Sequence, residues 1–211
     1  MKRVNRNLGR LPKTLLSIFF AGCITLPMTG CKSTLQVQGN FPSPLVNQLP
    51  LTMGVKYNPQ FKEFNYVEKN EKRDDWEIGI GSAQMALFDT VLPAMFKQVI
   101  AINEIPPSSG DNIDLYFEPT LEEFQYNMPR ETKINMYEVW IKYNMKVYDK
   151  HGQLIADWIL TAYGKTPSAF MKSEESALNE ALVVALRDAG AGLALRFAHV
   201  PEINSWLEQY K

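Results

Sequence analysis

The feature that most constrains the fold is a pair of alternating segments on either side of Asp149-Lys150-His151-Gly152. Every second residue is apolar or aromatic from Tyr137 to Val147, and the same period returns from Leu154 to Ala162. A period of two places side chains on opposite faces of a strand. The sequence therefore predicts an antiparallel hairpin over residues 137–164.

The alternation also predicts how the two strands of this hairpin pair. With a four-residue turn at 149–152, paired positions sum to 301 and one face is apolar or aromatic throughout. Its predicted pairs are Val139 with Ala162, Ile141 with Leu160, Tyr143 with Trp158, Met145 with Ala156, and Val147 with Leu154. The other face carries Trp140, Lys142 and Asn144, as in a sheet with one buried and one solvated side. A slip of one residue would exchange the two faces, so the register is a specific prediction.

A long, alanine-rich helix is predicted after Ser173, which can cap it, with Glu174 and Glu175 in its first turn. Its inward stripe consists of Leu178, Ala181, Leu182, Ala185, Leu186, Ala189 and Leu193. Gly190 and Gly192 have two interpretations, close packing inside the domain or a contact face for another chain. Pro201 ends this helix, and Ile203, Trp206 and Leu207 indicate a short terminal helix.

The first half of the chain has weaker signals. A strand is predicted over residues 51–57 and a second extended segment over 61–67, followed by a charged, solvated loop over 68–75. Apolar residues at steps of three and four predict a helix over 83–102, capped by Ser82 and kinked at Pro93. A further strand begins near Ile113, and Pro119 places it at a sheet edge or a bulge.

These elements predict an α+β fold, a mostly antiparallel sheet with two principal helices packed on one face. Residues 51–211 are predicted to form a single domain, long enough to bury a core without disulfides.

The N-terminus has the order of an export signal. Residues 1–13 carry five basic and no acidic side chains, and residues 14–28 are mostly apolar. This apolar stretch is shorter than the roughly 20 residues that cross a bilayer, so a retained transmembrane anchor is the lesser alternative. Residues 1–30 are interpreted as a cleaved signal peptide that ends before Cys31. Cys23 is a rival site, because Ala21-Gly22 also places small residues before a cysteine.

Met28-Thr29-Gly30-Cys31 resembles the signal of bacterial lipoproteins. The resemblance implies that Cys31 carries acyl chains such as palmitate and anchors the protein in a membrane. Lys32 stands where an Asp would retain an enterobacterial lipoprotein at the inner membrane, which implies the periplasmic face of the outer membrane.

Residues 31–50 are predicted to combine this lipidated cysteine with a flexible tether, because Pro42, Pro44 and Pro50 exclude a continuous helix. The alternative is that the segment packs against the domain through its apolar side chains, Phe41, Leu45, Val46 and Leu49.

The net charge of the chain argues against nucleic acid as a partner. Residues 1–30 hold five of the 22 basic and none of the 23 acidic residues, so the remaining chain has 17 basic against 23 acidic residues, a net charge of −6. Nucleic-acid grooves and polybasic lipid contacts need clustered Lys and Arg, so no nucleic-acid partner is expected.

We find no motif for catalysis, a cofactor or a metal. His151 and His199 lie in dissimilar places, and no cysteine follows residue 31. Gly164-Lys165-Thr166 lacks the preceding glycine of a phosphate-binding loop. Glu118, Glu122 and Glu123 would act as catalytic carboxylates only if the fold brought them into a cleft. An enzyme is not expected, and neither is a cofactor or a metal.

The order of elements over residues 51–198 resembles the α+β sandwich of YajG-like lipoproteins, the N-terminal domain of TolB and the core of CsgG. The local signatures are Ile113-Asp114-Leu115, the Asp149 to Gly152 hairpin tip and Ala185-Leu186-Arg187-Asp188-Ala189. Only Cys31 carries over as a functional residue. The chain has no propeller, unlike TolB, and no obvious membrane-spanning hairpins, unlike CsgG.

The leading hypothesis is a non-enzymatic, lipid-anchored interaction module for an envelope machine in transport, secretion or cell-wall assembly. Its candidate contact residues for an envelope protein partner are Trp140 and Tyr148, on the solvated face of the predicted sheet. A second hypothesis is an auxiliary that binds lipid or a small apolar ligand in a cleft opened at Pro93. A hydrolase acting through carboxylates is a third.

Overall fold

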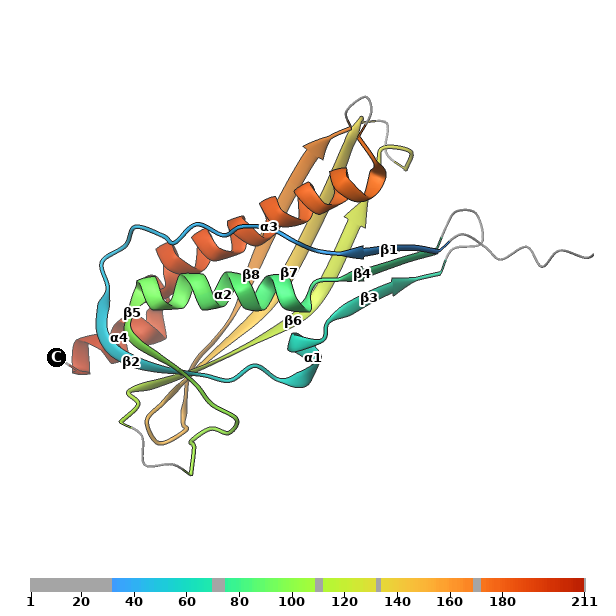
Figure 1. Cartoon of the computed structure of the whole chain (residues 1–211). Coiled ribbons are helices and arrows are strands. Elements are labelled where there is room, and N and C mark those ends of the chain that lie inside the picture. The colour runs from blue at the N-terminus through green and yellow to red at the C-terminus, as the bar shows by residue number, and fades with distance from the viewer. Residues whose placement is uncertain (1–31, 70–74, 109–111, 132–133, 169–171, 211) are drawn as a thin grey trace, which may run out of the picture. The chain divides into compact units, whose positions relative to one another are not determined.

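The computed structural model describes residues 32–69, 75–108, 112–131, 134–168 and 172–210 (Figure 1). The strands are β1 (Lys32–Gln36), β2 (Leu49–Val55), β3 (Asn65–Glu68), β4 (Asp75–Gly79), β5 (Phe96–Ala101), β6 (Leu115–Asn127), β7 (Met136–Asp149) and β8 (Leu154–Pro167). The helices are α1 (Pro59–Lys62), α2 (Gly81–Met95), α3 (Glu174–Arg196), the 3-10 helix η1 (Phe197–His199) and α4 (Pro201–Tyr210).

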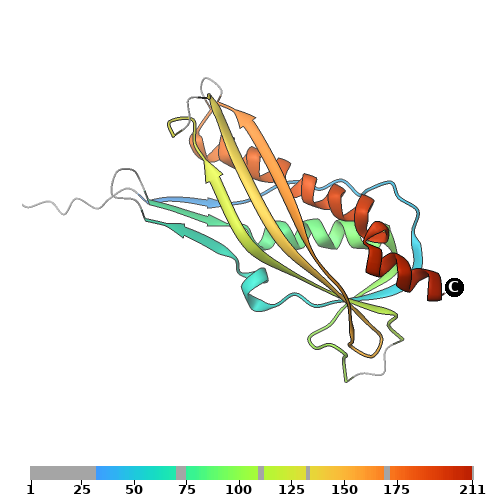
Figure 2. The same cartoon turned by 180° about the vertical axis from the view of Figure 1, so that it is seen from behind.

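The strands form two sheets, in the orders β1-β4-β3 and β5-β2-β6-β7-β8. Most of the pairing is antiparallel, and the parallel pairs are β1 with β4, β2 with β5 and β2 with β6. Helices α2 and α3 lie on one face of the five-stranded sheet, and Figure 2 shows its other face without a helix in front of it. The predicted α+β class is confirmed.

The hairpin of β7 and β8 has the predicted faces but not the predicted register. Val139 pairs with Gly164 and Ile141 with Ala162, so paired positions sum to 303 rather than 301. The turn is one residue tighter than predicted, because Asp149 N donates to Gln153 O and the Asp149 carboxylate accepts from two turn amides. An extra residue, Ile155, then shifts the pairing beyond Tyr148 and Leu154. The two changes together move the register by two, which keeps the side chains from Ala156 onward on their predicted faces. Leu154 was predicted to pair with Val147 on the apolar face, but it pairs with Tyr148 instead and is 54% exposed.

Helix α3 begins as predicted, with Ser173 Oγ accepting from Ser176 N at 3.1 Å. It lies unusually close to β8, since a Cβ built on Gly164 would be 2.1 Å from Ala181 O. A Cβ on Gly190 would be 2.8 Å from Leu87 Cδ1, so this glycine serves close packing of α3 on α2.

The predicted helix over 83–102 is wrong at both ends. Helix α2 starts at Gly81, with Ile80 rather than Ser82 at the N-cap, and ends at Met95. Residues 96–101 form β5, which pairs with β2. Pro93 lies in the last turn of α2, where its carbonyl accepts from Gln48 Nε2 at 2.9 Å, so the predicted mid-helix kink becomes a helix end.

Strand β6 explains the position of Pro119. Strand β2 pairs with β6 only as far as Phe117, so beyond this residue one edge of β6 has no strand beside it among the described residues. Pro119 lies just past that point, which agrees with the predicted edge position, because a residue without an amide hydrogen loses no ladder bond there. The register shifts once more between Leu121 and Glu123.

The flexible tether predicted for residues 31–50 is wrong for residues 32–50. Strand β1 pairs with β4, and Leu35 and Val37 are buried. Residues 37–48, called the strap from here on, then run along α3 toward β2 (Figure 1). The Asn179 side chain exchanges two hydrogen bonds of 2.9 Å with the backbone of Gln38. The alternative prediction, in which this segment packs against the domain, therefore describes it. Leu45 is the exception, because it is fully exposed.

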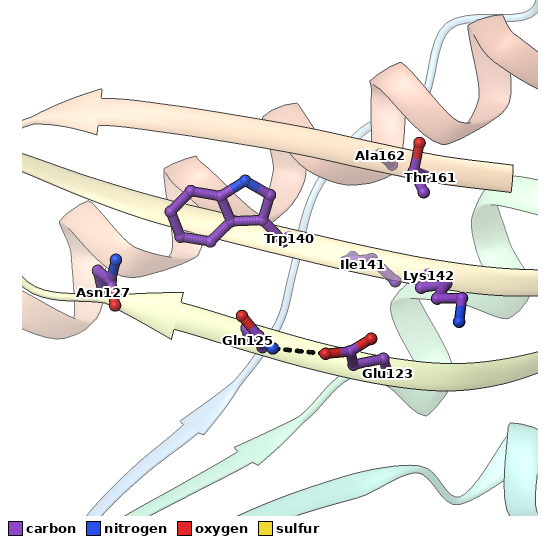
Figure 3. A pocket seen from close by; sticks show the side chains of 8 residues that line it. All are labelled: Glu123, Gln125, Asn127, Trp140, Ile141, Lys142, Thr161 and Ala162. Atoms are coloured by element: carbon purple, nitrogen blue, oxygen red, sulfur yellow. Dashed lines mark hydrogen bonds between the residues drawn. The ribbon is translucent and has the colours of Figure 1, made fainter.

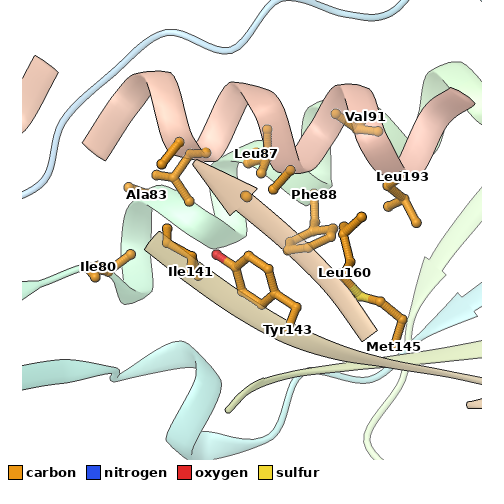
Figure 4. Packing of buried hydrophobic residues seen from close by; sticks show 14 of the residues in the cluster. Ile80, Ala83, Leu87, Phe88, Val91, Ile141, Tyr143, Met145, Leu160 and Leu193 are labelled. Atoms are coloured by element: carbon orange, nitrogen blue, oxygen red, sulfur yellow. The ribbon is translucent and has the colours of Figure 1, made fainter. Parts of the chain in front are cut away.

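The core lies between the five-stranded sheet and the two helices (Figure 4). Phe88 of α2 contacts Tyr143 of β7 edge to face, with 5.8 Å between ring centroids. Gln84 is a fully buried polar residue, and its side chain accepts from Tyr143 Oη at 3.2 Å and donates to Phe61 O.

Candidate interaction surface

The surface of most interest is the solvated side of β6, β7 and β8, which faces away from α2 and α3. We call it the open face. It consists of Glu118, Thr120, Glu123, Gln125, Asn127, Glu138, Trp140, Lys142, Asn144, Lys146, Tyr148, Asp157, Ile159, Thr161, Tyr163 and Lys165. This face follows from the alternation of the hairpin. The residues that alternate with these along each strand point to the other side of the sheet and pack in the core.

Trp140 is 37% exposed at one end of this face. Its ring lies 5.2 Å from that of Tyr163, the residue directly opposite it on β8. The Tyr163 hydroxyl donates to Glu138 Oε1 at 2.6 Å. This hydrogen bond, together with desolvation and the Glu138 charge, raises the pKa of Tyr163 to about 12. The indole is therefore supported by a neighbour that is itself held in place.

A shallow pocket of about 330 Å³ lies beside Trp140 (Figure 3). Its walls come from β6, β7 and β8 and consist of Glu123, Gln125, Asn127, Trp140, Ile141, Lys142, Thr161 and Ala162. The Gln125 side chain donates to Glu123, and Lys142 forms an ion pair of 3.3 Å with Glu122. The pocket thus combines one aromatic wall with several fixed polar groups.

Tyr148 lies on the same face but not at the same site. It is eight residues from Trp140 on β7, a distance of about 26 Å along a strand. Its hydroxyl donates to Glu118 Oε2 at 3.1 Å, and Glu118 also forms an ion pair of 2.8 Å with Lys56. Burial and the Glu118 carboxylate raise the pKa of Tyr148 to about 12. The structure therefore joins Trp140 with Tyr163 and leaves Tyr148 in a separate cluster.

The three glutamates considered as catalytic carboxylates have separate partners. Glu118 binds Lys56, Glu122 binds Lys142 and Glu123 accepts from Gln125. Among the described residues, no group of three or more His, Cys, Asp or Glu side chains is placed to hold a metal ion. His151 lies in the hairpin turn and His199 in η1.

The cleft predicted between the sheet and a kinked helix is not formed in the described part of the chain. Phe88, Leu87 and Val91 fill the space beneath α2 (Figure 4). The spaces along α2 measure about 150 Å³ under the strap and about 60 Å³ beside Met95. Sites for ligands of drug size span about 300–1,000 Å³. Neither of these two spaces reaches that range.

Cys31 and Cys23, the two candidate lipidation sites, lie outside the described residues. None of the helices in the described ranges is both long and apolar enough to cross a membrane.

No protein-family model and no curated protein matches this chain. Several solved structures are similar to this chain. One is a Xanthomonas campestris protein of the DUF330 family, 14% identical, which covers 83% of this chain and 99% of its own, with a TM-score of 0.49. A minor lipoprotein from Acinetobacter baumannii is 9% identical, with 72% and 94% covered and a TM-score of 0.45.

A third similar structure is the uncharacterized lipoprotein B of Nitrosomonas europaea, 12% identical, with 80% and 97% covered and a TM-score of 0.40. At these identities, similarity to the three structures does not indicate a shared activity or a shared partner. The resemblance to YajG-like proteins, TolB and CsgG stays a prediction.

Proposed function

We propose that this protein is a non-enzymatic interaction module, anchored by lipid on Cys31 at the periplasmic face of the outer membrane. Its partner is a protein of an envelope machine in transport, secretion or cell-wall assembly. The partner binds the open face at the pocket beside Trp140.

The observation that carries the proposal is the open face itself. A sheet with one face covered by helices leaves the other to solvent or to a partner. Here the uncovered face presents a supported Trp–Tyr pair next to a pocket. Aromatic residues are enriched at the centres of protein interfaces and dominate their energetics. The Lys142–Glu122 ion pair and the Glu138 carboxylate, which accepts from Tyr163, place charges of both signs near Trp140. This mixture fits a protein partner better than an anionic polymer.

The test is site-specific photocrosslinking in cells that make the full chain. A photoreactive phenylalanine at Thr161, an exposed residue that lines the pocket, is expected to capture a discrete protein partner. The control probe replaces Val184, which is 40% exposed on α3, on the helical side of the sheet. We expect no adduct from that position.

The second step adds Trp140→Ala to the Thr161 probe. Truncation of an aromatic anchor costs about 2 kcal/mol or more, so affinity should fall about thirtyfold and the adduct should disappear. Thermal unfolding of the variant checks that the domain is intact. A Thr161 probe that captures nothing, or an adduct that survives Trp140→Ala, would overturn the proposal for this surface.

A further inference from the structure

The chain between the anchor and the fold is one peptide bond long. Strand β1 begins at Lys32, the residue after Cys31. Consecutive Cα atoms are 3.8 Å apart across a trans peptide. If Cys31 carries the lipid, as proposed above, the first residue of the domain lies at the membrane surface.

Strand β1 is held firmly in the domain. It pairs with β4 over five residues, from Lys32 opposite Asp75 to Gln36 opposite Gly79. Leu35 is 7% exposed and lies in the core. The chain that follows is fixed to α3, because Arg187 donates to Asn40 O at 2.8 and 3.1 Å. The domain therefore cannot move away from the anchor by more than the length of Cys31 itself without breaking these contacts.

We propose that the end of the three-stranded sheet where β1 begins docks against the bilayer, so that the domain stands at a fixed height and orientation. Strand pairing identifies the residues of this end. Asp75 lies opposite Lys32, and Glu68 of β3 lies opposite Trp76 of β4. Val67 of β3 is 52% exposed near this end, about 10 Å from β1 across two strand spacings. Helix α4 lies at the opposite end (Figures 1 and 2).

The charge of this end identifies what holds it in place. In the sequence, Lys32 and residues 68–75 hold four basic and four acidic residues. A balanced set gives no net attraction to anionic headgroups, unlike a polybasic segment. The acyl chains, with about 0.8 kcal/mol per buried methylene, supply the attachment. The docked orientation is therefore the same on neutral and anionic bilayers.

Depth-dependent quenching tests this arrangement. The full chain is made in a bacterial host that processes lipoproteins, purified and reconstituted in phosphatidylcholine vesicles with a nitroxide on the lipid headgroup. A single cysteine at Val67→Cys or at Gln209→Cys of α4 carries the fluorophore. Either one is the only free thiol, since Cys23 leaves with the signal peptide and Cys31 is acylated. We expect strong quenching at position 67 and none at 209.

A twenty-residue Gly-Ser insertion between Cys31 and Lys32 provides the control. Such a linker has an end-to-end distance of about 25 Å, so it should abolish the quenching at position 67. Equal quenching at 67 and 209, or a difference that survives the insertion, would overturn the docked arrangement. The intact mass separates this result from failure of the proposed function. A protein without acyl mass refutes the anchor, whereas an acylated protein with equal quenching refutes only the docking.

Discussion

Gly164 is the residue at which the sheet and α3 come closest. A Cβ at this position would lie 2.1 Å from Ala181 O and 2.4 Å from Ala185 N, both backbone atoms that cannot rotate away. Gly164→Ala should therefore push the helix off the sheet and lower the free energy of unfolding by about 3 kcal/mol. Urea denaturation measures this loss. Lys165→Ala, at the exposed neighbouring residue, should leave the midpoint unchanged, and equal midpoints for the two variants would contradict the close approach.

The buried pair of Gln84 and Tyr143 is a second sensitive point. Tyr143→Phe removes the donor to Gln84 Oε1 and leaves a fully buried acceptor without that partner. The loss should be about 1–3 kcal/mol in chemical denaturation. Tyr148→Phe removes the hydroxyl of a half-exposed tyrosine and should cost less than about 1 kcal/mol. The reverse ranking of the two variants would show that Gln84 does not depend on Tyr143.

The anchor makes the clearest single-residue prediction. Cys31→Ser should abolish incorporation of labelled palmitate and release the protein from the membrane fraction. Cys23→Ser should leave both unchanged, because residue 23 lies inside the predicted signal peptide. Loss of label from the Cys23 variant alone would assign the lipid to the rival site.

Tyr163 shows what sequence reasoning missed at the candidate site. The alternation placed Trp140 on the solvated face, but the 301 register paired it with Thr161. The three-residue turn and the extra Ile155 bring Tyr163 opposite Trp140 instead. The Asp149 side chain, which accepts from the amides of the turn, is the local signal that could have predicted the tighter turn.

At the scale of elements, the hairpin makes a prediction about pH. Because Glu138 raises the pKa of Tyr163 to about 12, the folded state binds this proton more tightly than the unfolded chain, where tyrosine titrates near 10. The stabilisation is complete below pH 10 and is lost as pH rises toward 12. NMR of the tyrosine rings should show the Tyr163 pKa falling toward 10 in Glu138→Ala, while that of Tyr148 stays near 12. A Tyr163 pKa near 12 in both proteins would contradict this cause.

The hairpin and α3 were predictable because local and tertiary signals agree there. Ser173, the acidic first turn and the apolar stripe all specify one helix, and alternation over long strands specifies the faces. In contrast, residues 96–101 continue the apolar spacing of α2 yet form β5, because pairing with β2 decides their structure. The sequence predicted no strand at β4 because its start lies in a charged run.

At the scale of the whole molecule, residues 32–50 are part of the fold. A protein that begins at residue 51 would lack β1 and the strap. It would expose Trp76 and Ile78 of β4, which are 1% and 0% exposed in the full domain. We expect it to be insoluble or unfolded by circular dichroism, whereas a protein that begins at residue 32 should fold. A well-folded protein from residue 51 would restore the tether interpretation.

The strap also has a consequence for the timing of assembly. Its hydrogen bonds join residues 141 and 147 positions apart in the chain, from Gln38 to Asn179 and from Asn40 to Arg187. Contacts of such long sequence separation close large loops and form late. The strap is made early, but these hydrogen bonds have no partner until α3 follows. Completion of the domain is therefore postponed until nearly the whole chain has been made.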